Sequence, residues 1–107
     1  MAVPFKAPVK DITFGYEVID SYNILNKISE FSDFSEDIVI PTMEECAKFS
    51  EEVLAPINAI GDQQGATIDN GVVKMPQEFV DAYKKFAEAG WASISLPEEI
   101  GGGGQPI

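Results

Sequence analysis

Residues 76–90 read PQEFVDAYKKFAEAG and carry the clearest structural signal in the chain. Their apolar side chains recur every three or four residues, which places them on one face of an α-helix. Proline is favoured at the start of a helix, and glycine just after its end, where the backbone turns left-handed. We therefore predict a helix that starts at Pro76 and ends before Gly90. Its apolar stripe comprises Phe79, Val80, Tyr83, Phe86 and Ala87.

A second helix is predicted upstream of it. Ser35 is a favourable N-cap, and the two acidic residues that follow suit the positive end of a helix dipole. We expect Pro41 near the first turn, where its missing N–H costs little; a helix that began earlier would be kinked there. Pro56 is expected to bend or interrupt the helix. The predicted buried face comprises Val39, Met43, Cys46, Ala47, Ser50, Val53 and Leu54.

Weaker patterns precede these two helices. Residues 1–10 contain two prolines and are expected to be extended. Asp11 is expected to cap a helix whose apolar positions are Ile12, Tyr16 and Ile19. That helix either continues past Asp20 or breaks there and restarts as a second one. Residues 29–35 have no periodicity and are predicted to be a connector.

Residues 61–76 are predicted to be the one non-helical insert. Within them, Asn70 and Gly71 separate two short apolar pairs, and Asn-Gly favours a tight hairpin turn because both residues accept positive φ angles. The fold class predicted from all these patterns is mainly α, a small helical bundle with one short hairpin-like insert.

The charge balance excludes some functions. The 107 residues hold 18 acidic residues and 7 basic ones, with no histidine and a net charge of −11. Nucleic-acid binding needs clustered Lys and Arg, so it is not expected. No apolar run is long enough to span a bilayer, and no secretory signal is visible. The acids between residues 29 and 52 form either a docking face for a basic partner or a solvated helix surface.

The single cysteine, Cys46, cannot form an intramolecular disulfide and indicates a reducing compartment, so we expect a cytoplasmic location. Its sequence neighbours include no histidine that could activate the thiol, and we expect a small core residue. The usual histidine or multi-cysteine metal sites are also excluded.

Three other features invite a chemical interpretation. The glycine run 101–104 could cradle a phosphate, but it lacks the strand and helix of a nucleotide-binding fingerprint and is expected to be a flexible turn. Trp91 could stack on a ligand, although core packing fits its place before an apolar run, 91–96, expected to cross the core. The acidic pairs 51–52 and 98–99 have no basic or aromatic neighbour in sequence and are expected to be surface acids.

The chain resembles the N-terminal helical domain of flavin-dependent acyl-CoA dehydrogenases, in particular a long bacterial subgroup with an N-terminal extension. The resemblance rests on the joint order of several short runs and covers nearly the whole chain. They are Phe5 to Asp11 with Phe14; Glu52 to Asn58; Gly61-Asp62 and Gly65-Ala66; Gly71 to Val73 through Pro76, Phe79 and Ala82-Tyr83 to Ala89-Gly90-Trp91; and Pro97-Glu98-Glu99 with the following glycines. Ile100 departs from the pattern, where the family usually has an aromatic residue.

The resemblance implies residues 1–34 as an N-terminal extension and residues 35–107 as the start of the helical domain. It also implies FAD as the cofactor, an acyl-CoA thioester as the substrate of the full-length enzyme, and a homo-oligomer. The family's catalytic glutamate and flavin contacts have no counterpart here, so we assign no catalytic, cofactor-binding or metal-binding residue. We expect an inactive N-terminal fragment that binds no FAD alone. The alternative is a stand-alone acidic helical protein-interaction module.

Overall fold

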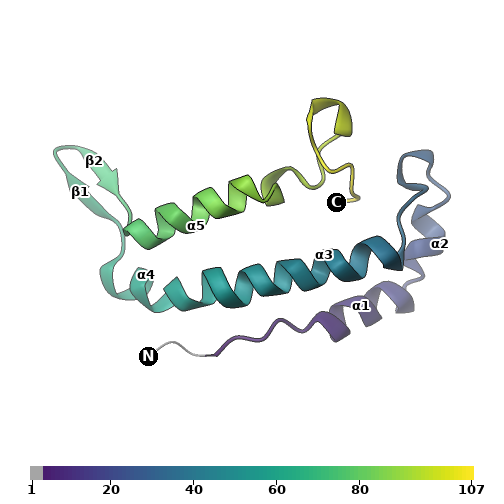
Figure 1. Ribbon diagram of the computed structural model, residues 1–107, viewed down its shortest axis with the longest axis horizontal. Helices are drawn as coiled ribbons and strands as arrows, with labels where there is room; N and C mark the ends of the chain where they lie inside the picture. The colour runs from purple at the N-terminus through teal and green to yellow at the C-terminus, as the bar shows by residue number, and fades with distance from the viewer. Residues whose placement is uncertain (1–3) are drawn as a thin grey trace.

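The computed structural model describes residues 4–107 and confirms a mainly-α fold with one short hairpin (Figure 1). The long helix α3 lies in the middle, with α1 on one side and α5 on the other (Figure 1). The elements are α1 (Val9–Val18), α2 (Ser21–Leu25), α3 (Glu36–Phe49), α4 (Asn58–Gln64), β1 (Thr67–Asp69), β2 (Val72–Lys74) and α5 (Gln77–Glu88).

The helical path continues from α3 to α4 without a break, although its hydrogen bonding changes along the way. A π-helical turn, Ser50–Leu54, follows α3, and a 3₁₀ turn, Ala55–Ile57, leads into α4. Ala55 N–H donates to the carbonyl of Ser50, five residues back. Pro56 is the second residue of the 3₁₀ turn, a position at which a backbone N–H has no hydrogen-bond partner within that turn. Its missing N–H therefore interrupts the α-helical hydrogen bonding without ending the helix.

Two expectations about this path were wrong. Pro41 lies inside α3, in its second turn, where its missing N–H leaves the carbonyl of Asp37 without an α-helical partner. Residues 61–64, predicted to be non-helical, belong to α4, which runs on until Gly65 takes a φ of 62°. The N-cap position at Ser35 is confirmed, and its carbonyl accepts the N–H of Val39, but its side chain makes no capping hydrogen bond.

The two N-terminal helices, α1 and α2, form a bent pair, the N-terminal hook. Asp11 does not cap α1: the helix begins at Val9 with Pro8 as N-cap, because Ile12 N–H already reaches the Pro8 carbonyl. Asp20 adopts a φ of 55°, so the break that the sequence left open occurs there and α2 restarts at Ser21. Residues 29–35 form a 3₁₀ turn, Ser29–Phe31, and a connector, as expected.

An aromatic cluster ties the hook to the start of α3. Tyr16, Tyr22 and Phe34 contact one another, with ring centroids 5.4–6.3 Å apart. Burial in this cluster, reinforced by the negative charges of Glu36 and Glu17, raises the pKa of the Tyr22 hydroxyl.

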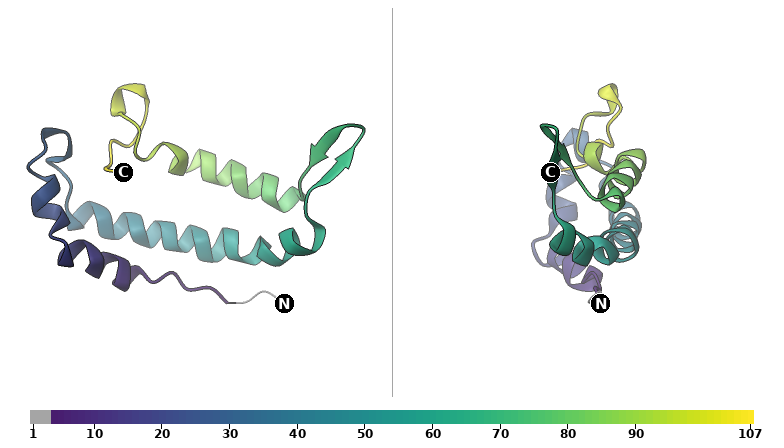
Figure 2. Two further views of the ribbon diagram at one scale, coloured as in Figure 1. Left: turned by 180° about the vertical axis from the view of Figure 1, so that it is seen from behind. Right: turned by 90° about the vertical axis from the view of Figure 1, so that its left-hand side faces the viewer.

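The hairpin is confirmed at the predicted turn. β1 and β2 are antiparallel, with Ile68 opposite Val73, and Asn70 and Gly71 both have positive φ angles of 49° and 78°. Positive φ at both central residues is the pattern of a two-residue type I′ turn, whose twist matches that of the flanking strands. The hairpin extends from one end of the molecule (Figure 2), and all six of its strand residues are exposed.

The core is thin. Among the described residues, the buried apolar side chains are Phe34, Val39, Ala47, Pro76 and Ala82. Several positions of the predicted apolar faces are exposed, whereas Ala82 is buried instead. The exposed positions are Cys46, Leu54, Val80, Tyr83 (71% exposed) and Ala87.

Candidate functional site

An apolar groove lies where α5 faces the end of the α3–α4 helical path. It encloses about 290 Å³ and is lined by Leu54, Ile57, Asn58, Phe79, Ala82, Tyr83 and Phe86. Asn58 and the hydroxyl of Tyr83 are the only polar side-chain groups in this lining. The groove therefore suits apolar side chains and offers no charge to an anion.

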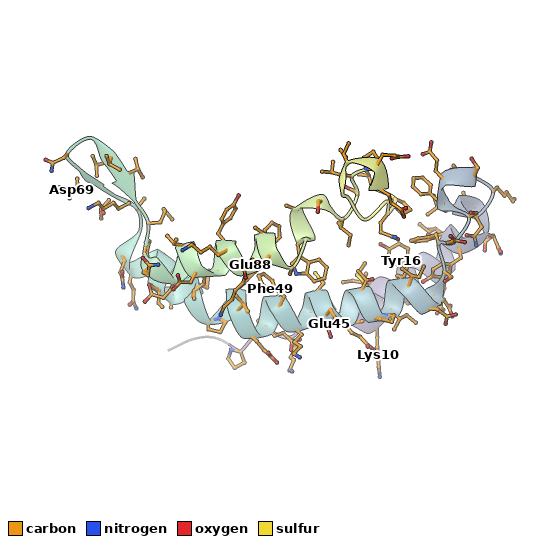
Figure 3. All side chains as sticks on the ribbon, turned by 45° about the horizontal axis from the view of Figure 1, so that its top comes forward. Lys10, Tyr16, Glu45, Phe49, Asp69 and Glu88 are labelled. Carbon is orange, nitrogen blue, oxygen red and sulfur yellow. The ribbon has the colours of Figure 1, made fainter. Side chains whose placement is uncertain are left out.

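Gly61 allows α5 to approach α4 at this point. A Cβ atom on Gly61 would lie only 2.5 Å from Cζ of Phe79, so any larger residue would push the Phe79 ring away. Next along the interface, Phe49 of α3 lies 6.2 Å from Phe86 and 6.5 Å from Trp91 between ring centroids. Figure 3 shows the Phe49 side chain on the side of α3 that faces α5. Trp91 is half-buried against this pair, which agrees with packing rather than ligand stacking.

The segment after Trp91 does not cross the core as expected. A 3₁₀ turn, Trp91–Ser93, follows Gly90, which has the predicted left-handed backbone with a φ of 80°. The chain then folds back on itself. The glycine run closes this loop: the N–H groups of residues 102, 103, 104 and 105 donate to the carbonyls of residues 97, 93, 96 and 94, at 2.9–3.0 Å.

The glycine run is therefore a closed loop rather than an open, flexible turn. A Cβ on Gly102 would lie 2.1 Å from the carbonyl oxygen of Leu96, and one on Gly103 would lie 2.7 Å from that of Ile94. Only glycine permits this approach of two backbone segments. Because four successive amides are engaged inside the loop, they do not point at a phosphate.

Glu51 corrects the expectation for the acidic pairs. Its carboxylate accepts the backbone N–H of Ala7 at 2.9 Å and the Nζ of Lys6 at 3.1 Å. The bond from Ala7, and then that from Lys6, lower the pKa of Glu51. The sequence could not reveal this, because the partners lie 44 and 45 residues away. The other acids between residues 29 and 52 are exposed.

Cys46, expected in the core, lies exposed on α3. Val39 and Ala47 of the same helix are buried instead. Among residues 4–107, no three His, Cys, Asp or Glu side chains are grouped closely enough to hold a metal ion.

The described residues form an open, mainly helical layer with an apolar groove and an internally closed glycine loop. Sequence comparison relates this unit to a curated acyl-CoA dehydrogenase. The chain is 36% identical over 102 residues to the 3-methylmercaptopropionyl-CoA dehydrogenase of Ruegeria pomeroyi. That similarity covers 95% of this chain and 17% of the relative, so the chain spans about a sixth of that enzyme's length. No protein-family model matches the chain.

No helix among the described residues is both long enough and apolar enough to cross a membrane.

Proposed function

We propose that this chain serves as the N-terminal scaffold of an FAD-dependent acyl-CoA dehydrogenase, which removes hydrogen from the α and β carbons of an acyl-CoA thioester. The observation that carries the proposal is the 36% identity along 95% of the chain to a curated acyl-CoA dehydrogenase. In this scheme residues 1–34 are the extension and residues 35–107 begin the helical domain. The flavin supplies the hydride acceptor, and parts of the enzyme outside this chain supply the base.

The chemistry of the described residues supports a scaffold role for this chain, with the flavin and the base provided elsewhere in the enzyme. The apolar groove has no cationic side chain, and the chain contains no arginine to grip the phosphates of FAD or coenzyme A. The amides of the glycine loop are already engaged. These residues do not fit a flavin or a CoA phosphate group, so no step of the reaction is assigned to them.

The surface area supports a scaffold that is covered by further protein. The chain exposes 8041 Å², whereas a folded monomer of this mass exposes about 5,800 Å². Its radius of gyration is 17.5 Å, against about 13 Å for a compact domain of this length. The excess is comparable with one side of a large obligate interface. The apolar groove and the exposed hairpin are the surfaces that we expect the rest of the enzyme to cover.

A chimera tests this proposal. The corresponding segment of the Ruegeria pomeroyi enzyme is replaced by this chain, and FAD content and dehydrogenation of 3-methylmercaptopropionyl-CoA are measured. We expect a flavin-containing, active chimera, while the same enzyme without the segment loses both properties. A chimera that folds into a stable oligomer but holds no flavin would contradict the proposal.

The isolated chain provides the complementary measurement. We expect it to retain no flavin after gel filtration with excess FAD and to reduce no dye in the presence of acyl-CoA. A yellow, active preparation of the isolated chain would show that its own residues carry the chemistry.

A further inference from the structure

The segment before α1 lies along the outside of the α3–α4 helical path (Figures 1 and 2). Residues 4–8 have no helical or strand structure, and Pro4, Lys6 and Pro8 are exposed. Among the described residues, its only hydrogen bonds to the α3–α4 path are those that Ala7 N–H and Lys6 Nζ donate to Glu51. The hydrogen bonds that attach this segment to the helices therefore converge on one carboxylate.

The π-helical turn places that carboxylate. Because Pro56 cannot continue the α-helical ladder, the turn Ser50–Leu54 takes up i→i+5 bonding and shifts the positions of its side chains relative to those of α3. Glu51 lies on this turn, half-buried, while the next residue, Glu52, is exposed. Single π-helical turns of this kind are frequent at functional positions.

The segment has the properties of an element that can detach as a unit. It contains two prolines, which hold it extended whether or not it is bound and so reduce the entropy lost on binding. A tight turn, in which Val9 N–H donates to the Ala7 carbonyl at 2.9 Å, separates it from α1. Phe5 remains 48% exposed over a shallow pocket that it shares with Ala55 and Pro56, so only about half of its surface is buried there.

We propose that residues 4–8 are a releasable strap, that Glu51 is the clasp that fastens it to the π-helical turn, and that the strap can leave without unfolding α3. Release frees the N-terminal segment as an extended arm and uncovers the surface around Ala55 and Pro56. The ion pair with Lys6 contributes little to the clasp, because the Lys6 side chain is 88% exposed. The hydrogen bond from the Ala7 backbone carries most of it, since it joins an amide to a charged acceptor.

The test compares Glu51→Ala, Glu51→Gln and the matched control Glu52→Ala in the whole chain. Amide exchange of Ala7 is followed by NMR, together with that of Ala47 in α3, and proteolysis after Lys6 gives a second readout. In Glu51→Ala we expect Ala7 exchange and cleavage after Lys6 to rise about tenfold, with Ala47 unchanged. Glu51→Gln keeps an acceptor but loses the charge, so it should give a smaller rise. Glu52→Ala should stay within about twofold of the unmodified chain.

Two results would overturn the proposal. One is unchanged Ala7 exchange in Glu51→Ala and Glu51→Gln, which would mean that the strap is held by other contacts. The other is a parallel rise at Ala7 and Ala47, which would mean that the strap and α3 open together. If Glu51→Ala does not fold, the comparison of Glu51→Gln with Glu52→Ala decides between the same outcomes.

Discussion

At the scale of single residues, two positions determine how distant backbone segments meet. Gly102 lets the C-terminal loop close against Leu96, and Glu51 joins the N-terminal segment to the π-helical turn. The missing side chain of Gly102 and the charge of Glu51 each allow a contact that the helical spacing of apolar residues does not predict. Substitutions at these positions should therefore have effects larger than their exposure suggests.

Gly102→Ala should destabilise the chain by about 1–3 kcal/mol, because the added methyl group overlaps the Leu96 carbonyl and forces the loop apart. Urea unfolding followed by circular dichroism measures the change. Gly15→Ala is the control: Gly15 lies in α1 with nothing within 4 Å of the added Cβ, so alanine should stabilise by about 0.5–1 kcal/mol. Equal stability of the two variants would show that the loop is not closed in solution.

Glu51 should titrate below its ordinary pKa of 4.5, because its ionised form accepts the Ala7 and Lys6 hydrogen bonds. A lowered folded-state pKa means that the contribution of Glu51 to stability is present above the unfolded-state pKa and is lost as the pH falls through the folded-state pKa. NMR titration of the Glu51 carboxyl carbon measures this directly. Lys6→Ala should raise the pKa of Glu51 part of the way toward its ordinary value. An unchanged Glu51 pKa in that variant would show that the hydrogen bond from Lys6 does not lower it.

At the scale of elements, the helix from Glu36 to Gln64 tolerates two prolines in different ways. Pro56 coincides with the change from π to 3₁₀ bonding, so the backbone adapts around it. Pro41 lies inside a regular α-helix, where nothing compensates for its missing donor. The helix forms nevertheless because its covered face, with Val39 and Ala47, is buried against its neighbours.

Pro41→Ala should therefore stabilise the chain by about 1–3 kcal/mol, since it restores a donor for the Asp37 carbonyl and removes the unfavourable propensity of proline. Pro41 is exposed, so little packing is lost. Thermal unfolding measures the gain. Pro76→Ala is the comparison, because Pro76 is buried and caps α5, and its replacement should not stabilise. A Pro41→Ala variant with a lower midpoint would mean that the proline holds a needed kink.

At the scale of the whole molecule, the chain is an open layer of 54 × 34 × 18 Å. Large apolar side chains remain exposed on α1, α2, α5, the hairpin and the C-terminal loop. Patches of this extent in a soluble protein mark surfaces that bind other protein. The net charge of −11 opposes association of copies at long range but is screened within about 8 Å at physiological salt.

We therefore predict that the isolated chain self-associates at physiological salt and becomes more monomeric at low salt, where repulsion reaches further. Tyr83→Glu places a charge on the exposed rim of the apolar groove and should shift the population toward monomer by about tenfold or more in the dissociation constant. Sedimentation velocity at several concentrations checks this, with Glu88→Gln on the same helix as control. A clean monomer at high concentration and salt would contradict the prediction.

The sequence by itself determined the features that depend on neighbouring residues. The end of α5 just before Gly90, the Asn70–Gly71 turn and the N-cap position at Ser35 follow from local backbone preferences, which act over three or four residues. The apolar residues of the groove, such as Phe79 and Phe86, were also recognisable from their helical spacing. The family resemblance, too, came from the order of short runs.

Only the tertiary structure decided which of these apolar residues are covered. Ala82 is buried while Tyr83 is exposed, and Cys46 lies outside the core, because burial depends on which element packs against each face. The closed glycine loop and the Glu51 clasp likewise join groups that are distant in sequence or that no periodic pattern marks. Local preferences are set by the residues on either side, whereas these contacts exist only once separate segments have been brought together in space.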